Sequence, residues 1–147
     1  MMEMQKFAER LNEYMFSHSL NATQLAEKTG IARSTICGLL RKEHLPSTTA
    51  LVAFVEYFHC PADYLLGLID DFVEPVKFST PSNTFAERLR CLLVETNTTQ
   101  YFLTKHHKIS GNLLYKWLND QAIPSVYNLI KLAKALNVSV DCLLGRE

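Results

Sequence analysis

The sequence of 147 residues predicts an all-α protein made of two related domains in tandem. Two observations lead to this prediction. When the chain is aligned with itself at an offset of 78 residues, without a gap, identical residues recur in one register. Within each copy the apolar residues follow helical spacing, and no segment alternates convincingly between apolar and polar residues as a half-buried strand would.

The repeat runs from one end of each copy to the other. FAERL occurs at 7–11 and again at 85–89, and DYLLG at 63–67 returns as DCLLG at 141–145. Fifteen of the 61 aligned positions are identical in this register. The offset is too long for a solenoid repeat, and each copy has the size of a small self-standing domain. We therefore expect one domain at 1–68, a linker at 69–83 and a second domain at 84–147.

The first predicted helix of each copy has apolar residues at the i, i+4, i+7 and i+8 positions of one helical face. These are Phe7, Leu11, Tyr14 and Met15 in the first copy, and Phe85, Leu89, Leu92 and Leu93 in the second. In the second copy Thr84 and Glu87 have the spacing of a capping box in front of this helix.

The segment NATQLAEKTGIARSTICGLL at 21–40 predicts a helix, a tight turn and another helix. Asn21 is a suitable helix cap, Gly30 suits a left-handed residue that ends a helix, and a new helix is expected near Arg33. The inward residues are expected to be Leu25, Ala26, Ile36 and Leu39 or Leu40. This is the helix-turn-helix arrangement, whose second helix can lie in a DNA major groove.

The second copy departs from the first in this segment. Lys108 stands where the first copy has Gly30, so the turn must use a left-handed non-glycine residue, at a cost of about 1 kcal/mol, or change its shape. Thr104 replaces Ala26 at a position expected to face inward. Trp117 aligns with Leu39 and is expected in the core.

A Pro-Ser pair starts the fourth predicted helix in both copies, at 46–47 and 124–125. Its apolar stripe is Leu51, Val52, Val55 and Phe58 in one copy and Leu129, Ile130, Ala133 and Leu136 in the other. A short fifth helix contains DYLLG or DCLLG, and Gly67 and Gly145 are expected to end it.

These motifs, taken in order, resemble the lambdoid-repressor helix-turn-helix family, also called Cro/cI-type or XRE. The resemblance rests on LAEKTGIARSTI, the Pro-Ser start and DYLLG in the first copy, and on ISGNLLYKWL and IPSVYNLIKLAKALNVSVDCLLGR in the second. It implies two tandem five-helix lambda-repressor-like domains. It also implies a sequence-specific, double-stranded-DNA-binding transcriptional regulator, such as a repressor, and leaves activation or repression open.

The resemblance assigns roles to particular positions. The base-reading residues would be Arg33, Ser34, Thr35 and Gly38 in the first domain, and Gly111, Asn112, Tyr115 and Lys116 in the second. Arginine can form two hydrogen bonds to guanine, and asparagine can do the same to adenine. The phosphate-binding residues would be Asn21, Arg41 and Lys42 in the first domain, and Thr99 and Gln100 in the second.

The charge distribution leaves a second interpretation open. The net charge is zero, but residues 1–72 hold six basic and nine acidic residues, and residues 73–147 hold nine basic and six acidic residues. Because the first domain is acidic, one or both domains could instead serve protein–protein interaction, dimerisation or an antitoxin-like role. If both domains bind DNA, the chain could act as an intrachain pseudo-dimer or as a homodimer.

Other functions have little support in the sequence. The four cysteines lack metal-ligand spacing and are expected to be reduced, and no catalytic constellation or phosphate-cradling glycine loop occurs. We therefore expect no enzyme activity, cofactor, metal or small-molecule ligand. No apolar stretch approaches the roughly 20 residues of a membrane span, and the N-terminal residues lack the pattern of a secretory signal, so a cytoplasmic location is expected.

Overall fold

The computed structural model describes residues 2–74, 76 and 83–146. Over these residues the secondary structure consists of ten α-helices, and no strand occurs among them. The chain divides into two compact units, Met1–Val76 (unit 1) and Lys77–Glu147 (unit 2), each with five helices. The prediction of an all-α protein with two tandem five-helix domains is confirmed. None of the described helices is both long enough and apolar enough to cross a membrane.

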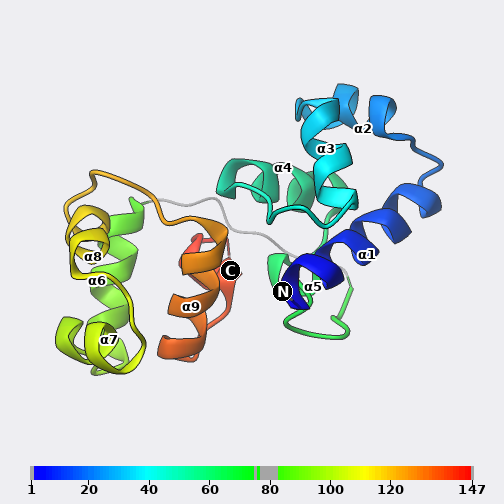
Figure 1. The fold of residues 1–147 in the computed structure, drawn as a ribbon. Helices are drawn as coiled ribbons and strands as arrows, with labels where there is room; N and C mark the ends of the chain where they lie inside the picture. Colours follow the sequence, from blue (N-terminus) through cyan, green and yellow to red (C-terminus); the bar gives the residue numbers. More distant parts are fainter. Residues whose placement is uncertain (1, 75, 77–82, 147) are drawn as a thin grey trace. The chain divides into compact units, whose positions relative to one another are not determined.

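Unit 1 places its first helix against the third and fifth, and its second helix against the third and fourth. Its helices are α1 (Met2–Ser17), α2 (Ala22–Thr29), α3 (Arg33–Leu40), α4 (Thr48–Phe58) and α5 (Ala62–Leu65) (Figure 1). The fully buried side chains include Phe7, Leu11, Leu25, Ile36, Leu39, Leu51 and Phe54. The apolar face of α1 therefore forms one side of the core. Leu25, Ile36 and Leu39 of the helix-turn-helix are buried in the same core.

Unit 2 repeats this order of helices. They are α6 (Phe85–Glu95), α7 (Gln100–His106), α8 (Gly111–Leu118), α9 (Val126–Leu136) and α10 (Val140–Leu143) (Figure 1). α6 packs against α8 and α10, and α8 also packs against α7. Trp117 is 1% exposed, which confirms its predicted place in the core. Thr104, in contrast, is exposed and donates to the Gln100 carbonyl, so the expectation that it faces inward is wrong.

Side-chain caps begin several of the helices, among them those expected at Asn21 and Thr84, whereas α3 and α5 have no side-chain cap. The Asn21 side chain accepts from the Gln24 N–H (2.8 Å), and the Gln24 side chain accepts from the Asn21 N–H (2.9 Å). Thr84 accepts from the Glu87 N–H (3.2 Å), and Ser47 accepts from the Ala50 N–H (3.1 Å). Each cap satisfies an N–H that has no partner within its own helix.

The backbone conformation at the helix ends is the same in the two units, even where the side chains differ. Ten of the described residues have a positive φ, and they form five pairs at the 78-residue offset. The pairs are Ser19 and Asn97, Gly30 and Lys108, Lys42 and Asp120, His59 and Asn137, and Gly67 and Gly145. One pair lies just after each of the five helices, so the two units stop their helices at matching places. Only the last pair is glycine in both units.

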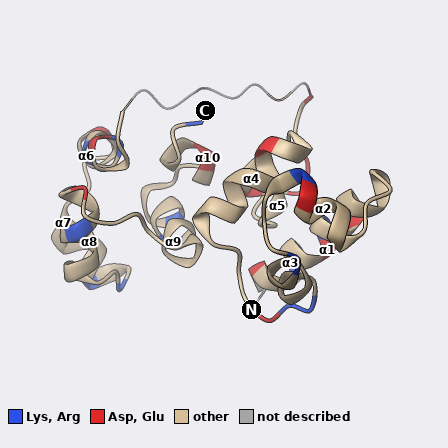
Figure 2. Ribbon diagram, turned by 90° about the horizontal axis from the view of Figure 1, so that it is seen from above, with Lys and Arg blue, Asp and Glu red and all other residues tan. Residues whose placement is uncertain are grey.

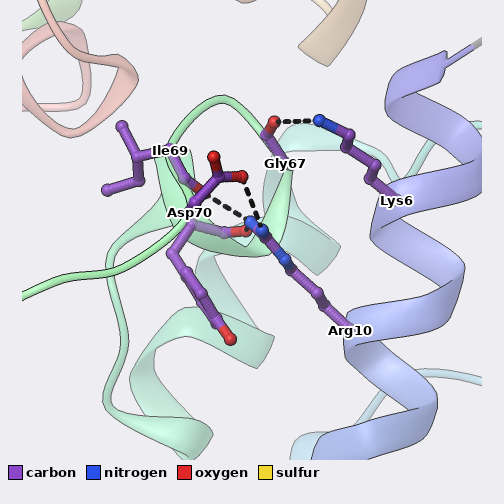
Figure 3. A network of polar contacts seen from close by, with 6 residues as sticks. Lys6, Arg10, Gly67, Ile69 and Asp70 are labelled. Atoms are coloured by element: carbon purple, nitrogen blue, oxygen red, sulfur yellow. Dashed lines mark hydrogen bonds and ion pairs between the residues drawn. The ribbon is translucent and has the colours of Figure 1, made fainter.

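The residues FAERL and DYLLG, which reveal the repeat, contact each other in unit 1. Arg10 of α1 donates to the Tyr64 and Ile69 carbonyls, the latter at 2.6 Å, and pairs with Asp70 at 3.4 Å (Figure 3). Lys6 donates to the Gly67 carbonyl at 3.4 Å. A Cβ at Gly67 would lie 2.4 Å from the Lys6 Cβ, and φ at Gly67 is 81°. The glycine is therefore required by both backbone conformation and space.

The matching arginine has the same position in unit 2. Arg88 donates to the Leu143 carbonyl (3.0 Å) and to the Asn83 carbonyl (2.6 Å). Burial lowers the pKa of Arg88. In both units, therefore, the arginine of FAERL donates to a carbonyl group of the fifth helix, that of Tyr64 in unit 1 and that of Leu143 in unit 2.

The segment after Gly67 folds back on unit 1. Ile69 and Asp70 bind Arg10, and the Phe72 ring lies 4.9 Å from the Tyr64 ring, centroid to centroid. These residues fall in the range expected to be linker. The remainder of the expected linker includes residues 75 and 77–82, which lie outside the described residues.

Candidate nucleic-acid interface

The first turn of α3 presents polar side chains in unit 1. Arg33 and Ser34 are exposed, and Thr35 is half-buried. Ala32 occupies the N-cap position and makes no side-chain cap. No ion pair or hydrogen bond engages the Arg33 side chain within the described part of the chain. Its five donors are thus available to a partner outside the unit.

Gly38 does not share this exposure, and its expected base-reading role is corrected. It is buried under the loop that follows α3. A Cβ at Gly38 would lie 2.8 Å from His44 Nε2 and 3.2 Å from Glu43 Oε2. The left-handed Lys42, with φ of 63°, accompanies the reversal of the chain after α3. Helical periodicity alone cannot predict this covering loop.

The two basic residues after α3 differ in availability. The Arg41 Nε donates to Glu43 Oε1 at 2.9 Å, and this contact raises the pKa of Arg41 and lowers that of Glu43. Both side chains are exposed, so a phosphate would compete with the Glu43 carboxylate for Arg41. Lys42 is exposed, whereas the Asn21 side-chain oxygen is occupied by its own capping bond.

The third helix of unit 2 carries a longer polar strip. Gly111, Asn112, Tyr115 and Lys116 are all exposed on α8. Asn112, Tyr115 and Lys116 have i, i+3 and i+4 spacing, which places their side chains on one helical face. Ser110 caps the helix by accepting from the Leu113 N–H at 3.4 Å. The four expected base-reading residues of unit 2 thus lie together on one exposed surface.

The start of α7 is also open to solvent. Thr99 accepts from the Phe102 N–H at 3.1 Å as the N-cap, and Gln100 is the exposed first residue of the helix. In unit 1 the matching positions hold the capping Asn21 and Ala22. Because Asn21 and Thr99 both serve as helix caps, the two units differ at this helix start in Gln100, which replaces Ala22 with a polar side chain.

The turn between α7 and α8 contains Lys108 in place of a glycine, and a second lysine, Lys131, contacts it. Lys108 adopts φ of 52°, so the left-handed conformation is retained. Lys131 of α9 donates to the Lys108 carbonyl at 3.1 Å, and its ammonium lies 5.4 Å from the Tyr127 ring centroid. The matching residues of unit 1 are Gly30 and Ala53, so the lysine and its partner replace a glycine and an alanine.

Several exposed residues beside this strip were not predicted as part of the site. Residues 97–138 contain five lysines and one acidic residue, whereas the matching residues 19–60 contain four basic and three acidic residues (Figure 2). Lys105 donates to the Tyr101 hydroxyl at 2.9 Å, and Tyr101 is 67% exposed. The difference in charge between residues 97–138 and residues 19–60 is a sequence signal that indicates these additional residues of unit 2.

Comparison with known proteins places helix-turn-helix domains in both units. A Cro/C1-type HTH DNA-binding domain family matches residues 10–71, and a helix-turn-helix family matches residues 106–141. An uncharacterized HTH-type transcriptional regulator, YobD of Bacillus subtilis, is 37% identical over 65 residues, or 44% of this chain. The matched region spans 58% of that relative's length. No solved structure matches the chain.

Proposed function

Because the chain carries two helix-turn-helix domains in tandem, we propose that it is a sequence-specific double-stranded-DNA-binding transcriptional regulator. The observation that carries this proposal is the exposed polar strip on α8, in a unit whose residues 97–138 contain five lysines and one acidic residue. Phosphates would be neutralised by the lysines, and base edges would be read by the helix.

Asn112 and Lys116 are the base-reading residues that we propose for unit 2, with Gly111 and Tyr115 beside them. An asparagine at the start of α8 could bind adenine through two hydrogen bonds, and each such pair discriminates by about 1–3 kcal/mol. Thr99 and Gln100 would bind the phosphate backbone and fix the register. Arg33, Ser34 and Thr35 would have the corresponding base-reading role in unit 1, with Lys42 toward phosphate.

The two sets of proposed base-reading residues differ in chemistry, with Arg33 and Ser34 in one unit and Asn112 and Lys116 in the other. If both units bind, we expect a composite site with two different half-sites on one chain, or a larger site filled by two chains. The number and spacing of the half-sites would separate an intrachain pseudo-dimer from a homodimer, because half-sites on one face of DNA are about 34 Å apart.

Selection from a pool of random DNA duplexes with the purified full chain tests the proposal. We expect a recurrent sequence to be enriched, and its affinity to fall steeply as salt rises, because binding releases counterions from the phosphates. Binding that is equal for all duplexes, or absent at low salt, would refute sequence-specific DNA recognition.

An alternative function is favoured by the composition of unit 1. Residues 1–72 are net negative, Arg41 is paired with Glu43, and Phe16 is 87% exposed on α1. On this alternative, unit 1 binds another protein, for dimerisation or as an antitoxin-like module, and only unit 2 binds DNA. A selected DNA site with a single half-site, together with concentration-dependent self-association lost in Phe16→Ser, would favour it.

A further inference from the structure

We propose that unit 1 contains a binding site for a small organic cation, separate from both helix-turn-helix surfaces. The site is an open cavity of about 360 Å³ between α1, α5 and the segment that follows α5, and its carboxylates are exposed to solvent. Its lining residues are Glu13, Tyr14, Ser17, Tyr64, Asp70, Asp71, Phe72 and Glu74. This volume lies within the range of small-molecule sites in proteins.

Three aromatic rings form the walls of the cavity. The Tyr64 ring is nearly perpendicular to the Tyr14 ring, with centroids 6.2 Å apart, and lies 4.9 Å from the Phe72 ring. Tyr14 stacks on Phe58 with centroids 4.9 Å apart, which holds it from behind. Burial raises the pKa of Tyr14, so its phenol is neutral and contributes ring surface without charge.

Four carboxylates line the same cavity, and among the residues that the structure describes no basic side chain lines it. Asp70 is paired with Arg10 at 3.4 Å. Glu13, Asp71 and Glu74 make no ion pair within the residues that the structure describes. A cation in the cavity would therefore meet three carboxylates that lack a counter-charge and three aromatic rings, whose faces attract positive charge.

Arg10 shows within this protein how such a cation binds. Its guanidinium lies 4.1 Å from the Tyr64 ring centroid and contacts the Asp70 carboxylate. The combination of aromatic ring and carboxylate that holds Arg10 continues into the cavity with Phe72 and Asp71. The ligand chemistry that fits is one or two ammonium or guanidinium groups on a short aliphatic stem.

Unit 2 shows that the fold itself does not need these side chains. At the 78-residue offset, Glu13, Tyr14 and Tyr64 correspond to Cys91, Leu92 and Cys142. The matching helices form nevertheless, with α10 packed on α6 as α5 packs on α1. The aromatic and acidic residues of unit 1 are thus an addition to the common fold, which supports a binding role for them.

The test uses agmatine, which carries a guanidinium and an ammonium on four methylenes, titrated into the full chain by calorimetry without DNA. We expect saturable binding with one site. Glu13→Gln combined with Asp71→Asn should weaken it about tenfold, because two carboxylates lose their charge. Phe72→Leu should weaken it about threefold to thirtyfold, the range for loss of one cation–π contact.

The matched control is Glu9→Gln combined with Glu27→Gln, which makes the same change in net charge at exposed positions outside the cavity. This control should leave the affinity unchanged. Magnesium at equal ionic strength should not compete, and 1,6-hexanediol should not bind. Absence of saturable binding, equal weakening in the control, or full competition by magnesium would overturn the proposal. Each outcome is independent of whether the chain binds DNA.

Discussion

Residues with the same backbone conformation differ in how strictly they are constrained. Gly30 and Gly67 both adopt a positive φ, of 77° and 81°. A Cβ at Gly30 would meet no atom within 4 Å, whereas a Cβ at Gly67 would overlap with the Lys6 side chain. Substitution at these two glycines therefore distinguishes two free-energy costs. One is the cost of a left-handed residue other than glycine, and the other is the cost of steric overlap.

Gly30→Ala should destabilise unit 1 by about 1 kcal/mol, the cost of a left-handed alanine. Gly67→Ala should cost distinctly more, because the Lys6 stem or α1 must also shift. Urea unfolding followed by circular dichroism measures both. Equal losses in the two variants would show that α1 relaxes freely and that space at Gly67 is not limiting.

Lys108→Gly should raise the stability of unit 2 by up to about 1 kcal/mol, because glycine removes the left-handed strain at this turn. Trp117 provides the measurement, since it is the single tryptophan of the chain and is buried in unit 2. Lys105→Gly removes the same charge inside α7 and should instead cost about 1 kcal/mol. A loss of stability in both variants would contradict the inference that the left-handed conformation of Lys108 destabilises unit 2.

At the level of secondary-structure elements, the third helices of the two units are alike in backbone and different in surface. α3 and α8 are both eight residues long and occupy matching positions. α3 exposes a polar first turn and then buries Gly38, whereas α8 remains polar as far as Lys116. These differences give α8 the longer exposed polar face of the two.

Reversal of one charge on each of these helices identifies the element that binds DNA. Lys116→Glu should abolish specific binding if α8 enters the groove, because a carboxylate there faces phosphates and acceptor edges. Lys116→Gln should weaken binding less, since it removes the contact without adding repulsion. Arg33→Glu makes the matching test of α3. The measurement is the affinity for the selected duplex. Normal binding in all three variants would contradict a DNA-binding role for either helix.

The helical elements could be predicted from sequence because their signals are local. Asn21, Ser47 and Thr84 cap the helices that their spacing predicts, and Gly67 ends the one that precedes it. The cover over Gly38 and the contacts of Asp70 and Phe72 depend on how loops return to the units. Such contacts join residues that no short pattern relates, so the sequence does not predict the cavity of unit 1, and four of its lining residues, Asp70, Asp71, Phe72 and Glu74, fall in the expected linker.

Across the whole molecule, a net charge of zero conceals two units of opposite sign. Residues 97–138 carry five lysines with one acidic residue, and the positions that match Glu27, Glu43 and Glu56 of unit 1 hold Lys105, Gln121 and Lys134. A neutral protein can therefore present one surface suited to phosphate. The charge relevant to binding is that of the unit, since salt screens charges beyond about 8–10 Å.

Salt dependence of DNA binding measures which unit contacts phosphates. Lys105→Gln combined with Lys108→Gln should reduce the slope of log affinity against log salt by about 0.9 for each lysine that contacts a phosphate. Lys28→Gln combined with Lys42→Gln makes the same change in unit 1. Equal reductions would show that both units lie on DNA, and a change confined to the unit 1 variant would contradict the leading role proposed for unit 2.

The five matched pairs of left-handed residues have a consequence for how a duplicated gene diverges. At Gly30 a Cβ would have room, and the matching position of unit 2 holds Lys108 in the same left-handed conformation. At Gly67 and Gly145 a Cβ would also collide with Lys6 or Arg88, and both copies remain glycine. The choice of residue at such a helix end is therefore limited by the neighbour that faces it, and the two units keep the same backbone conformation at positions where their side chains differ.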